Sequence, residues 1–261
     1  MSSASFKYIA RKAVYASGLL IKRSVGKVSK VSYKGRDNIL TNVDKASERL
    51  AIGIIKKAFP RHSILSEESR PIDSTSPYKW VIDPIDGTTN FAHSFPFFCV
   101  SIALEKNGES ILGIVYDPMR DETFMAEKGK GATLNGRRIH VSKVKSLRKS
   151  FLATGFSYGI TRKDRNIVYF RKLLVATQAI RRAGSAALDL CYVACGRFDG
   201  FWEMNLHPWD SAAGHLIVGE AGGTVTRFDG RDYSHYDRDI IATNGYIHSD
   251  MVRVLSRRKS G

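Results

Sequence analysis

The sequence predicts a mixed α/β protein built in layers. Its second half alternates segments of helical periodicity with short apolar runs, and its first half contains several apolar runs joined by turn-forming residues. With 261 residues and 43% hydrophobic content, the chain can bury a substantial core. It contains neither a GxGxxG fingerprint nor a Walker loop.

The first predicted element is an amphipathic helix near the N-terminus. Apolar and small residues recur there at helical spacing between Phe6 and Leu20. The first 36 residues also carry nine Lys or Arg and no acid, so an organelle transit peptide stays open as the alternative. The polar stretch over residues 24–42 predicts a hairpin or a loop.

A second helix is predicted over residues 44–59, with Asp44 at its N-cap and Pro60 at its end. Apolar runs that end in turn signals then predict a series of strands over residues 62–65, 78–82, 97–105, 111–116 and 122–127. Asn135-Gly136 marks a tight hairpin. Residues 143–149 are expected to connect two packed halves of one domain over residues 1–261, about 1–145 and about 146–261.

The second half of the chain predicts helices and strands in alternation. The expected helices span residues 164–176, 185–195, 210–220 and 248–257, and the one over 210–220 ends at a Gly-Gly pair. The expected strands span residues 178–181, 198–203, 224–227 and 240–242.

The chain is strongly basic, with 41 Lys and Arg against 25 Asp and Glu and a net charge of +16. Such a charge attracts anions, including phosphorylated metabolites, nucleic acid and acidic lipid. No motif interleaves aromatic with basic residues, so nucleic-acid binding is not the expected main function. The three cysteines lack metal-ligand spacing and predict core thiols in a reducing, cytoplasmic setting. We expect no signal peptide and no membrane span, because the apolar run over residues 13–21 is too short.

The stretch WVIDPIDGTTNFAH, residues 80–93, places Asp83 and Asp86 at the end of an apolar strand that Pro84 is expected to stop. Two close carboxylates repel each other unless a cation lies between them, and all-oxygen ligands suit Mg²⁺. The helix start that follows at Gly87 would offer backbone N–H groups to a phosphate. The ordinary alternative for this stretch is an Asx turn with a plain helix cap.

Two further acidic positions follow the same pattern. Glu67 and Glu68 come after a short apolar run, and Asp210 in HPWDSAAG opens a predicted helix behind Trp209, which would pack over the site. Taken alone, adjacent acids indicate a solvated turn and Asp210 an N-cap.

Together, SEES over residues 66–69, WVIDPIDGTTNFAH and HPWDSAAGHLIVGEAGG resemble the three motifs of the inositol monophosphatase family. The resemblance covers nearly the whole chain in the order and spacing of the family. It implies a Mg²⁺-dependent, lithium-sensitive phosphomonoesterase that acts on a small phosphate ester as a homodimer. It also implies the alternating α-β-α-β-α sandwich of the sugar phosphatases.

The resemblance assigns metal ligands residue by residue. Glu67, Asp83 and the backbone carbonyl of Ile85 would hold a first Mg²⁺. Asp83 would bridge to a second Mg²⁺, which Asp86 and Asp210 also hold. A third, weaker ion near Glu67 is a feature of the family.

The resemblance also assigns the catalytic groups. Thr88, with Asp44 behind it, would orient and deprotonate the attacking water, and Glu67 would assist through its metal. The N–H groups of Gly87 and Thr88 would bind the phosphate, and Asp86 would also face the substrate. Cysteine catalysis is not indicated, because Cys99 lies in an apolar strand and the chain has no C-x5-R loop.

The substrate pocket is expected from the second half. Glu203 in FWEMNLHPWD matches the family position whose carboxylate accepts hydrogen bonds from inositol hydroxyls, unless it is a solvent-facing acid at a strand end. Its expected companions are Arg181, Gly184, Ser185 and Ala186. Arg181 or Arg182 could instead brace a subunit interface.

Myo-inositol 1-phosphate is therefore the expected substrate. A broad-specificity sugar phosphatase or fructose-1,6-bisphosphatase is the alternative, while the Lys-bearing G-S-S-L-K stretch typical of nucleotide 3′-phosphatases is missing. The resemblance also extends to bacterial members of the family that associate with the transcription machinery. An added RNA-binding role is consequently a second hypothesis that the +16 charge makes conceivable.

Overall fold

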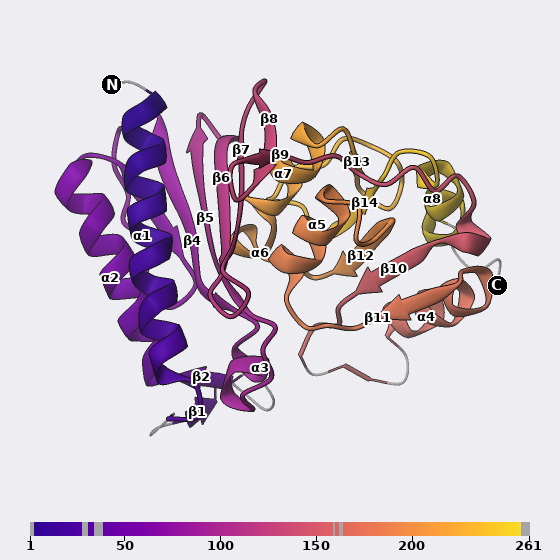
Figure 1. Cartoon of the computed structure of the whole chain (residues 1–261), viewed down its shortest axis with the longest axis horizontal. Coiled ribbons are helices and arrows are strands. Elements are labelled where there is room, and N and C mark those ends of the chain that lie inside the picture. The colour runs from indigo at the N-terminus through magenta and orange to yellow at the C-terminus, as the bar shows by residue number, and fades with distance from the viewer. Residues whose placement is uncertain (1–2, 28–30, 34–38, 159, 162–163, 257–261) are drawn as a thin grey trace.

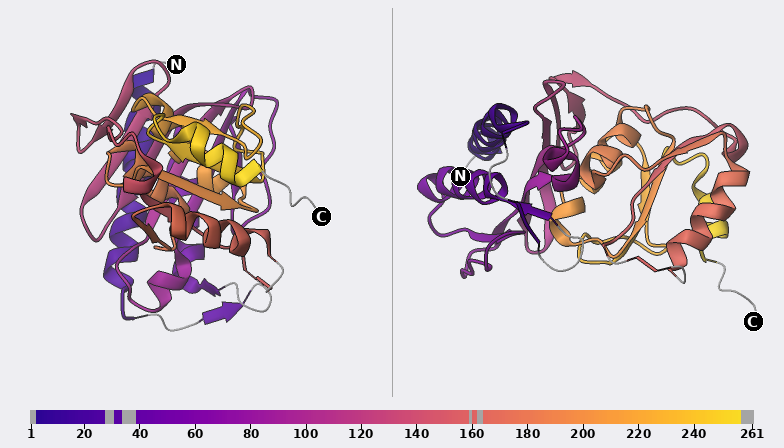
Figure 2. Two further views of the ribbon diagram at one scale, coloured as in Figure 1. Left: turned by 90° about the vertical axis from the view of Figure 1, so that its right-hand side faces the viewer. Right: turned by 90° about the horizontal axis from the view of Figure 1, so that it is seen from below.

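The computed structural model has five layers in the order α-β-α-β-α, as the resemblance implied (Figure 1). It describes residues 3–27, 31–33, 39–158, 160–161 and 164–256. Helices α1 (Ser3–Ser24) and α2 (Asn42–Ala58) form one outer layer, and α4 (Arg165–Ala176) and α8 (His248–Ser256) form the other. A seven-stranded sheet, a middle helical layer and a five-stranded sheet lie between them, and the view from below in Figure 2 shows the same order.

The first helix packs on the core, as its amphipathic pattern predicts. The α1 side chains of Phe6, Ala10, Val14 and Ile21 are buried between α2 and the seven-stranded sheet. The following polar stretch contains an antiparallel pair, β1 (Val31–Tyr33) and β2 (Ile39–Thr41), in agreement with the expected hairpin or loop. Residues 28–30 and 34–38 of that stretch lie outside the described part of the chain.

The seven-stranded sheet follows chain order from β3 to β9, with β3 and β4 parallel and every later pair antiparallel. Its strands are β3 (Ser63–Ser66), β4 (Tyr78–Asp86), β5 (Cys99–Lys106), β6 (Glu109–Asp117), β7 (Glu122–Glu127), β8 (Gly131–Leu134) and β9 (Arg137–Arg138). The predicted strands match these apart from their ends. The predicted Asn135-Gly136 hairpin joins β8 to β9, with both residues at positive φ.

The five-stranded sheet has the order β11-β10-β12-β14-β13. Its strands are β10 (Phe151–Thr154), β11 (Ala179–Arg181), β12 (Gly200–Met204), β13 (Thr224–Thr226) and β14 (Asp239–Thr243). Strand β10 was not predicted, although it lies inside the sheet and pairs in parallel with both β11 and β12. Between the sheets, residues 139–150 contain only a short 3₁₀ turn, Leu147–Lys149.

The middle layer consists of α5 (Ala186–Ala194), α6 (Pro208–Ser211) and α7 (Gly214–Glu220), which contact both sheets. The prediction of one continuous helix over residues 210–220 is wrong. The helix starts earlier, at Pro208, and is interrupted at Ala212 and Ala213. There the carbonyl of Ala212 accepts a hydrogen bond from the Ser110 hydroxyl of β6 at 2.9 Å.

The largest buried cluster lies between the two sheets and includes most of the apolar side chains of α5 and α7. Cys99 and Cys191 belong to it, and all three cysteines are free thiols. None of the helices in the described residues is both long enough and apolar enough to cross a membrane.

Candidate active site

A cleft of about 610 Å³ lies between the two halves and is lined by residues of both. All the site residues predicted from the sequence line it except Asp44 and Arg181. The acids that line it are Glu67, Asp83, Asp86, Asp189, Glu203 and Asp210. The folded chain thus gathers the three acidic motifs, which lie far apart in the sequence.

The end of β4 carries the first two of these carboxylates. The prediction that the strand stops at Pro84 is wrong, because β4 continues to Asp86. A register shift between the pairs Asp83↔Ser101 and Asp86↔Cys99 accommodates the proline, which needs no ladder partner there. Within this irregular end, Asp83 Oδ1 accepts a hydrogen bond from the Ile85 N–H at 3.0 Å.

Gly87 turns the chain from β4 into helix α3 (Thr88–Ala92). Its φ of 99° lies in the left-handed region that favours glycine. A Cβ at this position would also lie 3.0 Å from the Phe97 carbonyl oxygen and 3.2 Å from that of Gly184. Glycine is therefore required here both by conformation and by space, and the N–H groups at the start of α3 border the cleft.

Thr88 and Asp44 form a hydrogen-bonded pair at the edge of the cleft. The Thr88 hydroxyl lies 2.8 Å from Asp44 Oδ1 and 3.0 Å from the carbonyl oxygen of Ile85. Asp44 is fully buried behind Thr88, as expected. Burial raises the pKa of Asp44, although hydrogen bonds from Thr41 and Thr88 partly offset this increase.

The prediction that Asp44 is the N-cap of α2 is wrong. Thr41 is the N-cap, and Asp44 is the third residue of a capping box. Asp44 Oδ2 accepts a hydrogen bond from the Thr41 N–H at 2.9 Å, which leaves Oδ1 to Thr88. The cap thereby fixes the carboxylate that supports Thr88.

Glu48 of α2 holds the turn that carries Glu67. Its buried carboxylate accepts hydrogen bonds from the Ser66 hydroxyl and, at 2.8 Å, from the Glu68 N–H. Glu48 was not predicted from the sequence, although its spacing of four from Asp44 places both acids on one face of the helix.

Helix α5 begins at the carboxylate of Asp86. Asp86 Oδ2 accepts hydrogen bonds from the Ser185 hydroxyl at 2.7 Å and from the Ala187 N–H at 2.6 Å. Ser185 is also the N-cap of α5. Burial raises the pKa of Asp86 to about 6 despite these hydrogen bonds. Asp86 thus connects the first half of the chain to the segment expected to contact substrate.

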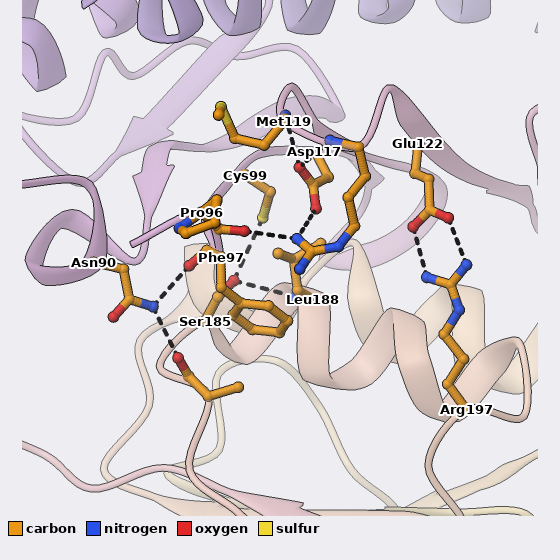
Figure 3. A network of polar contacts seen from close by, with 12 residues as sticks. Asn90, Pro96, Phe97, Cys99, Asp117, Met119, Glu122, Ser185, Leu188 and Arg197 are labelled. Atoms are coloured by element: carbon orange, nitrogen blue, oxygen red, sulfur yellow. Dashed lines mark hydrogen bonds and ion pairs between the residues drawn. The ribbon is translucent and has the colours of Figure 1, made fainter. Parts of the chain in front are cut away.

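Asn90 ties α3 to the same segment, as Figure 3 shows. Its side-chain amide donates to the Phe97 carbonyl at 2.7 Å and to the Ala183 carbonyl at 2.8 Å. Nearby, the Glu122 carboxylate and the Arg197 guanidinium form a two-pronged ion pair between β7 and the end of α5. These contacts fix the two halves on either side of the cleft.

Arg181 lies outside the cleft, in contrast to its expected role in substrate binding. It is exposed, and its guanidinium lies 4.7 Å from the centre of the Phe151 ring. Arg182 lines the cleft instead. Successive side chains at a strand end point to opposite faces, so only one of the two arginines can face the cleft.

Asp210 is the third residue of α6, and His207 is its N-cap. Asp210 Oδ2 accepts a hydrogen bond from the His207 N–H at 2.6 Å. The rings of His207 and Trp209 stack with their centres 4.9 Å apart, and both line the cleft, as expected for Trp209.

The cleft carries a strong excess of negative charge. Burial raises the pKa of Asp83 well above its usual value, and Glu67, Asp86 and Asp210 raise it further. Burial, followed by the nearby charge of Asp86, also raises the pKa of Asp210 well above its usual value. Burial and Asp86 also raise the pKa of Glu203 to about 8, while Arg182 opposes them.

This donor set fits a hard divalent cation. The groups are carboxylates and the Ile85 carbonyl, which are oxygen ligands. Burial and neighbouring acids have the largest effects on the pKa of Asp83, and no cationic side chain is among them. Among the described residues, no three acid, imidazole or thiol side chains lie close enough together to hold a metal ion by themselves. Water and a substrate phosphate would therefore complete the coordination, as is usual for Mg²⁺.

A model of the inositol monophosphatase family matches residues 3–260. Inositol-1-monophosphatase from Synechocystis is 47% identical over 251 residues, which cover 95% of this chain and 88% of that protein. Nus factor SuhB from Escherichia coli is 45% identical over 250 residues, covering 94% and 93%. The crystal structure of SuhB from Bartonella henselae matches with a TM-score of 0.93 and 40% identity, covering 98% and 99%.

Proposed function

The chain belongs to the inositol monophosphatase family, and we propose that its cleft hydrolyses inositol monophosphate to inositol and phosphate in the presence of Mg²⁺. One observation carries this proposal: Glu67, Asp83, Asp86 and Asp210 line one cleft, where Glu67 and Asp86 raise the carboxyl pKa values of both Asp83 and Asp210. Buried carboxylates that repel each other provide the ligands a divalent cation needs.

Glu67, Asp83, Asp86, Asp210 and the carbonyl of Ile85 would hold the metal. These residues would let a bound Mg²⁺ lower the pKa of a water and neutralise charge on the phosphate. The Thr88 hydroxyl orients that water: when its own proton points to Asp44, its lone pairs can accept a proton from the water. Asp44, which burial makes more basic, then accepts the proton that Thr88 passes on.

The substrate would lie between the two halves. The N–H groups of Gly87 and Thr88 face its phosphate at the start of α3. The backbone at Gly184 to Ala186 and the carboxylate of Glu203 face its hydroxyls. Arg182 and Arg238 line this pocket, whereas Arg181 does not.

The family resemblance adds finer features to the proposal. Two core Mg²⁺ ions with a third, weaker one, inhibition by lithium and a homodimer all belong to it. Fructose 1,6-bisphosphate stays an alternative substrate, since Glu203 and the 155–158 segment could also face a furanose ring.

The experiment is phosphate release at fixed Mg²⁺ from inositol 1-phosphate, fructose 1,6-bisphosphate, a nucleoside 3′,5′-bisphosphate and histidinol phosphate, with and without lithium. We expect inositol 1-phosphate to be preferred and all turnover to cease on chelation. Preference for a different ester would support the metal-dependent hydrolysis but contradict the substrate assignment. Turnover that survives chelation would contradict the proposed mechanism.

Asp83→Asn and Asp210→Asn should each lower kcat/KM by more than about 100-fold, because each removes a metal-ligand charge. Neither should lower the unfolding midpoint, because each removes a buried acid that its neighbours repel. Asp250→Asn in α8, a partly exposed acid that does not line the cleft, is the matched control and should keep full activity. Full activity in either cleft variant would overturn the metal assignment.

A second function, RNA binding, is supported by two observations. A relative that is 45% identical is named a Nus factor, and the chain carries a net charge of +16. Asp86→Asn should lose phosphatase activity yet retain RNA in a salt-dependent manner, because phosphate contacts release counterions. Failure of the wild-type chain to retain RNA at low salt would remove this second function.

A further inference from the structure

Gly155 follows strand β10 directly and lies beside Glu203. The parallel register pairs Thr154 with Trp202, so the next residues along each strand, Gly155 and Glu203, are neighbours. A Cβ built on Gly155 would lie only 2.1 Å and 2.2 Å from the two carboxylate oxygens of Glu203. The Glu203 carboxylate therefore occupies the space that a side chain at position 155 would need.

The backbone conformation does not explain this glycine. Gly155 is not among the residues with positive φ, so any residue could adopt its conformation. Space for the Glu203 carboxylate is the remaining structural requirement at this position.

The backbone around Gly155 is held from two sides. The Gly155 carbonyl accepts a hydrogen bond of 2.7 Å from the side-chain amide of Asn166, which is buried in α4. The indole N–H of Trp202 donates to the same Asn166 side chain at 2.7 Å, and the Thr154 hydroxyl donates to the Trp202 carbonyl at 2.7 Å. An added Cβ would consequently displace the Glu203 side chain rather than the strand.

We propose that Gly155 is a positioning residue that determines substrate specificity by keeping the Glu203 carboxylate against β10 and out of the space for the polyol ring. This inference rests on the proposed function, in which Glu203 faces the substrate hydroxyls. Both residues line the cleft, and Glu203 is 9% exposed. A side chain at position 155 pushes the carboxylate toward the ring, where it blocks binding and loses its alignment with the hydroxyls.

The test compares two substrates on the same preparation of enzyme. Gly155→Ala should lower kcat/KM for inositol 1-phosphate about 10- to 100-fold, the usual range for losing a hydrogen bond to a charged group. The loss should appear mainly in KM and be smaller for ethyl phosphate, which has no hydroxyls to align. The ratio of the two values is independent of the fraction of protein that folds.

Gly219→Ala is the matched control. It lies in α7, and a Cβ there would meet nothing within 4 Å, so both substrates should be hydrolysed as by the wild type. In a Glu203→Ala background the added Cβ fits into the vacated space, and Gly155→Ala should then leave the substrate ratio unchanged.

The possible failures of the test can be told apart. If the wild type does not hydrolyse inositol 1-phosphate, the proposed function fails. If the wild type does and Gly155→Ala keeps the wild-type substrate ratio, the positioning role is refuted. A further fall in the ratio on adding Gly155→Ala to Glu203→Ala would show that the Cβ acts on a group other than Glu203, which also refutes it.

Discussion

Asp189 is a buried carboxylate for which the described residues supply too few partners. It lies on α5, is 1% exposed and lines the cleft, and its Oδ1 accepts no hydrogen bond from the described chain. Burial raises the pKa of Asp189 well above its usual value, Glu203 and Asp86 raise it further, and Arg182 opposes them. Such a group lowers the stability of the folded state at neutral pH.

Asp189→Asn should therefore stabilise the protein by about 1–3 kcal/mol at pH 7, the order of a buried group's desolvation penalty, because the neutral amide lacks the charge that burial, Glu203 and Asp86 disfavour. The folded pKa is raised, so as the pH rises past about 4 the unfolded chain releases its proton first and folding loses stability. The gain from Asn should accordingly vanish below about pH 4. Urea unfolding at pH 7 and pH 4 measures both values, and a variant less stable than wild type at pH 7 would contradict this account.

Single residues also mark the limit of what the sequence could predict about the site. The acids proposed as metal ligands could be picked out from the sequence because they lie in motifs that resemble those of the family. The choice between Arg181 and Arg182 was not, because it depends on which face of the strand end meets the cleft. Gly155 was equally hidden, since its importance comes from a neighbour that lies 48 positions further along the chain.

At the scale of elements, the end of β4 shows how a sound local rule can mislead. Pro84 cannot donate a ladder hydrogen bond, which predicts a strand end. The register shift between Asp83 and Asp86 removes the need for that donor and lets the strand continue. The irregular end is also where both carboxylates enter the cleft. At Pro84, beside the site, the local preference for a strand end is therefore overridden by the tertiary arrangement of the sheet.

Strand β10 was missed for a different reason. It is four residues long, and its sequence FLAT has no alternating pattern because both neighbours are parallel strands in a buried sheet. The interruption between α6 and α7 was equally invisible, since the Ser110 hydroxyl that bonds to Ala212 comes from β6. Periodic helices and hairpins with Asn-Gly turns were predicted well because their signals are local.

At the scale of the whole molecule, Glu105 connects the two halves on the side away from α3. This buried residue of β5 accepts hydrogen bonds from His235 Nε2 at 2.5 Å and from the Tyr236 hydroxyl at 2.9 Å. Both partners lie in the connection between β13 and β14, and Lys79 adds a charge at 3.8 Å. We propose that this contact helps residues 1–261 to unfold as one domain.

Burial tends to raise the pKa of Glu105, but the hydrogen bonds and charges of His235, Tyr236 and Lys79 outweigh it and lower the pKa. Because the folded pKa is lowered, the contact stabilises the fold above the unfolded carboxyl pKa of about 4.3. That contribution is lost as the pH falls through the folded value. The two halves should therefore be held together most firmly at neutral pH.

Glu105→Gln should lower the free energy of unfolding at pH 7 by about 1–3 kcal/mol, because the charge that strengthens these hydrogen bonds is lost. The difference from wild type should shrink as the pH falls below the unfolded carboxyl pKa of about 4.3, and it should vanish below the lowered folded pKa, where the wild-type carboxyl is also neutral. Glu109→Gln, which breaks an exposed ion pair with Lys128, is the matched control and should change stability by less than about 0.5 kcal/mol.

Urea unfolding followed by tryptophan fluorescence and by residual activity should give one coincident transition in the wild type. Two separate transitions would show that the halves unfold independently, and an equal loss in both variants would show that Glu105 acts only as an ordinary surface charge.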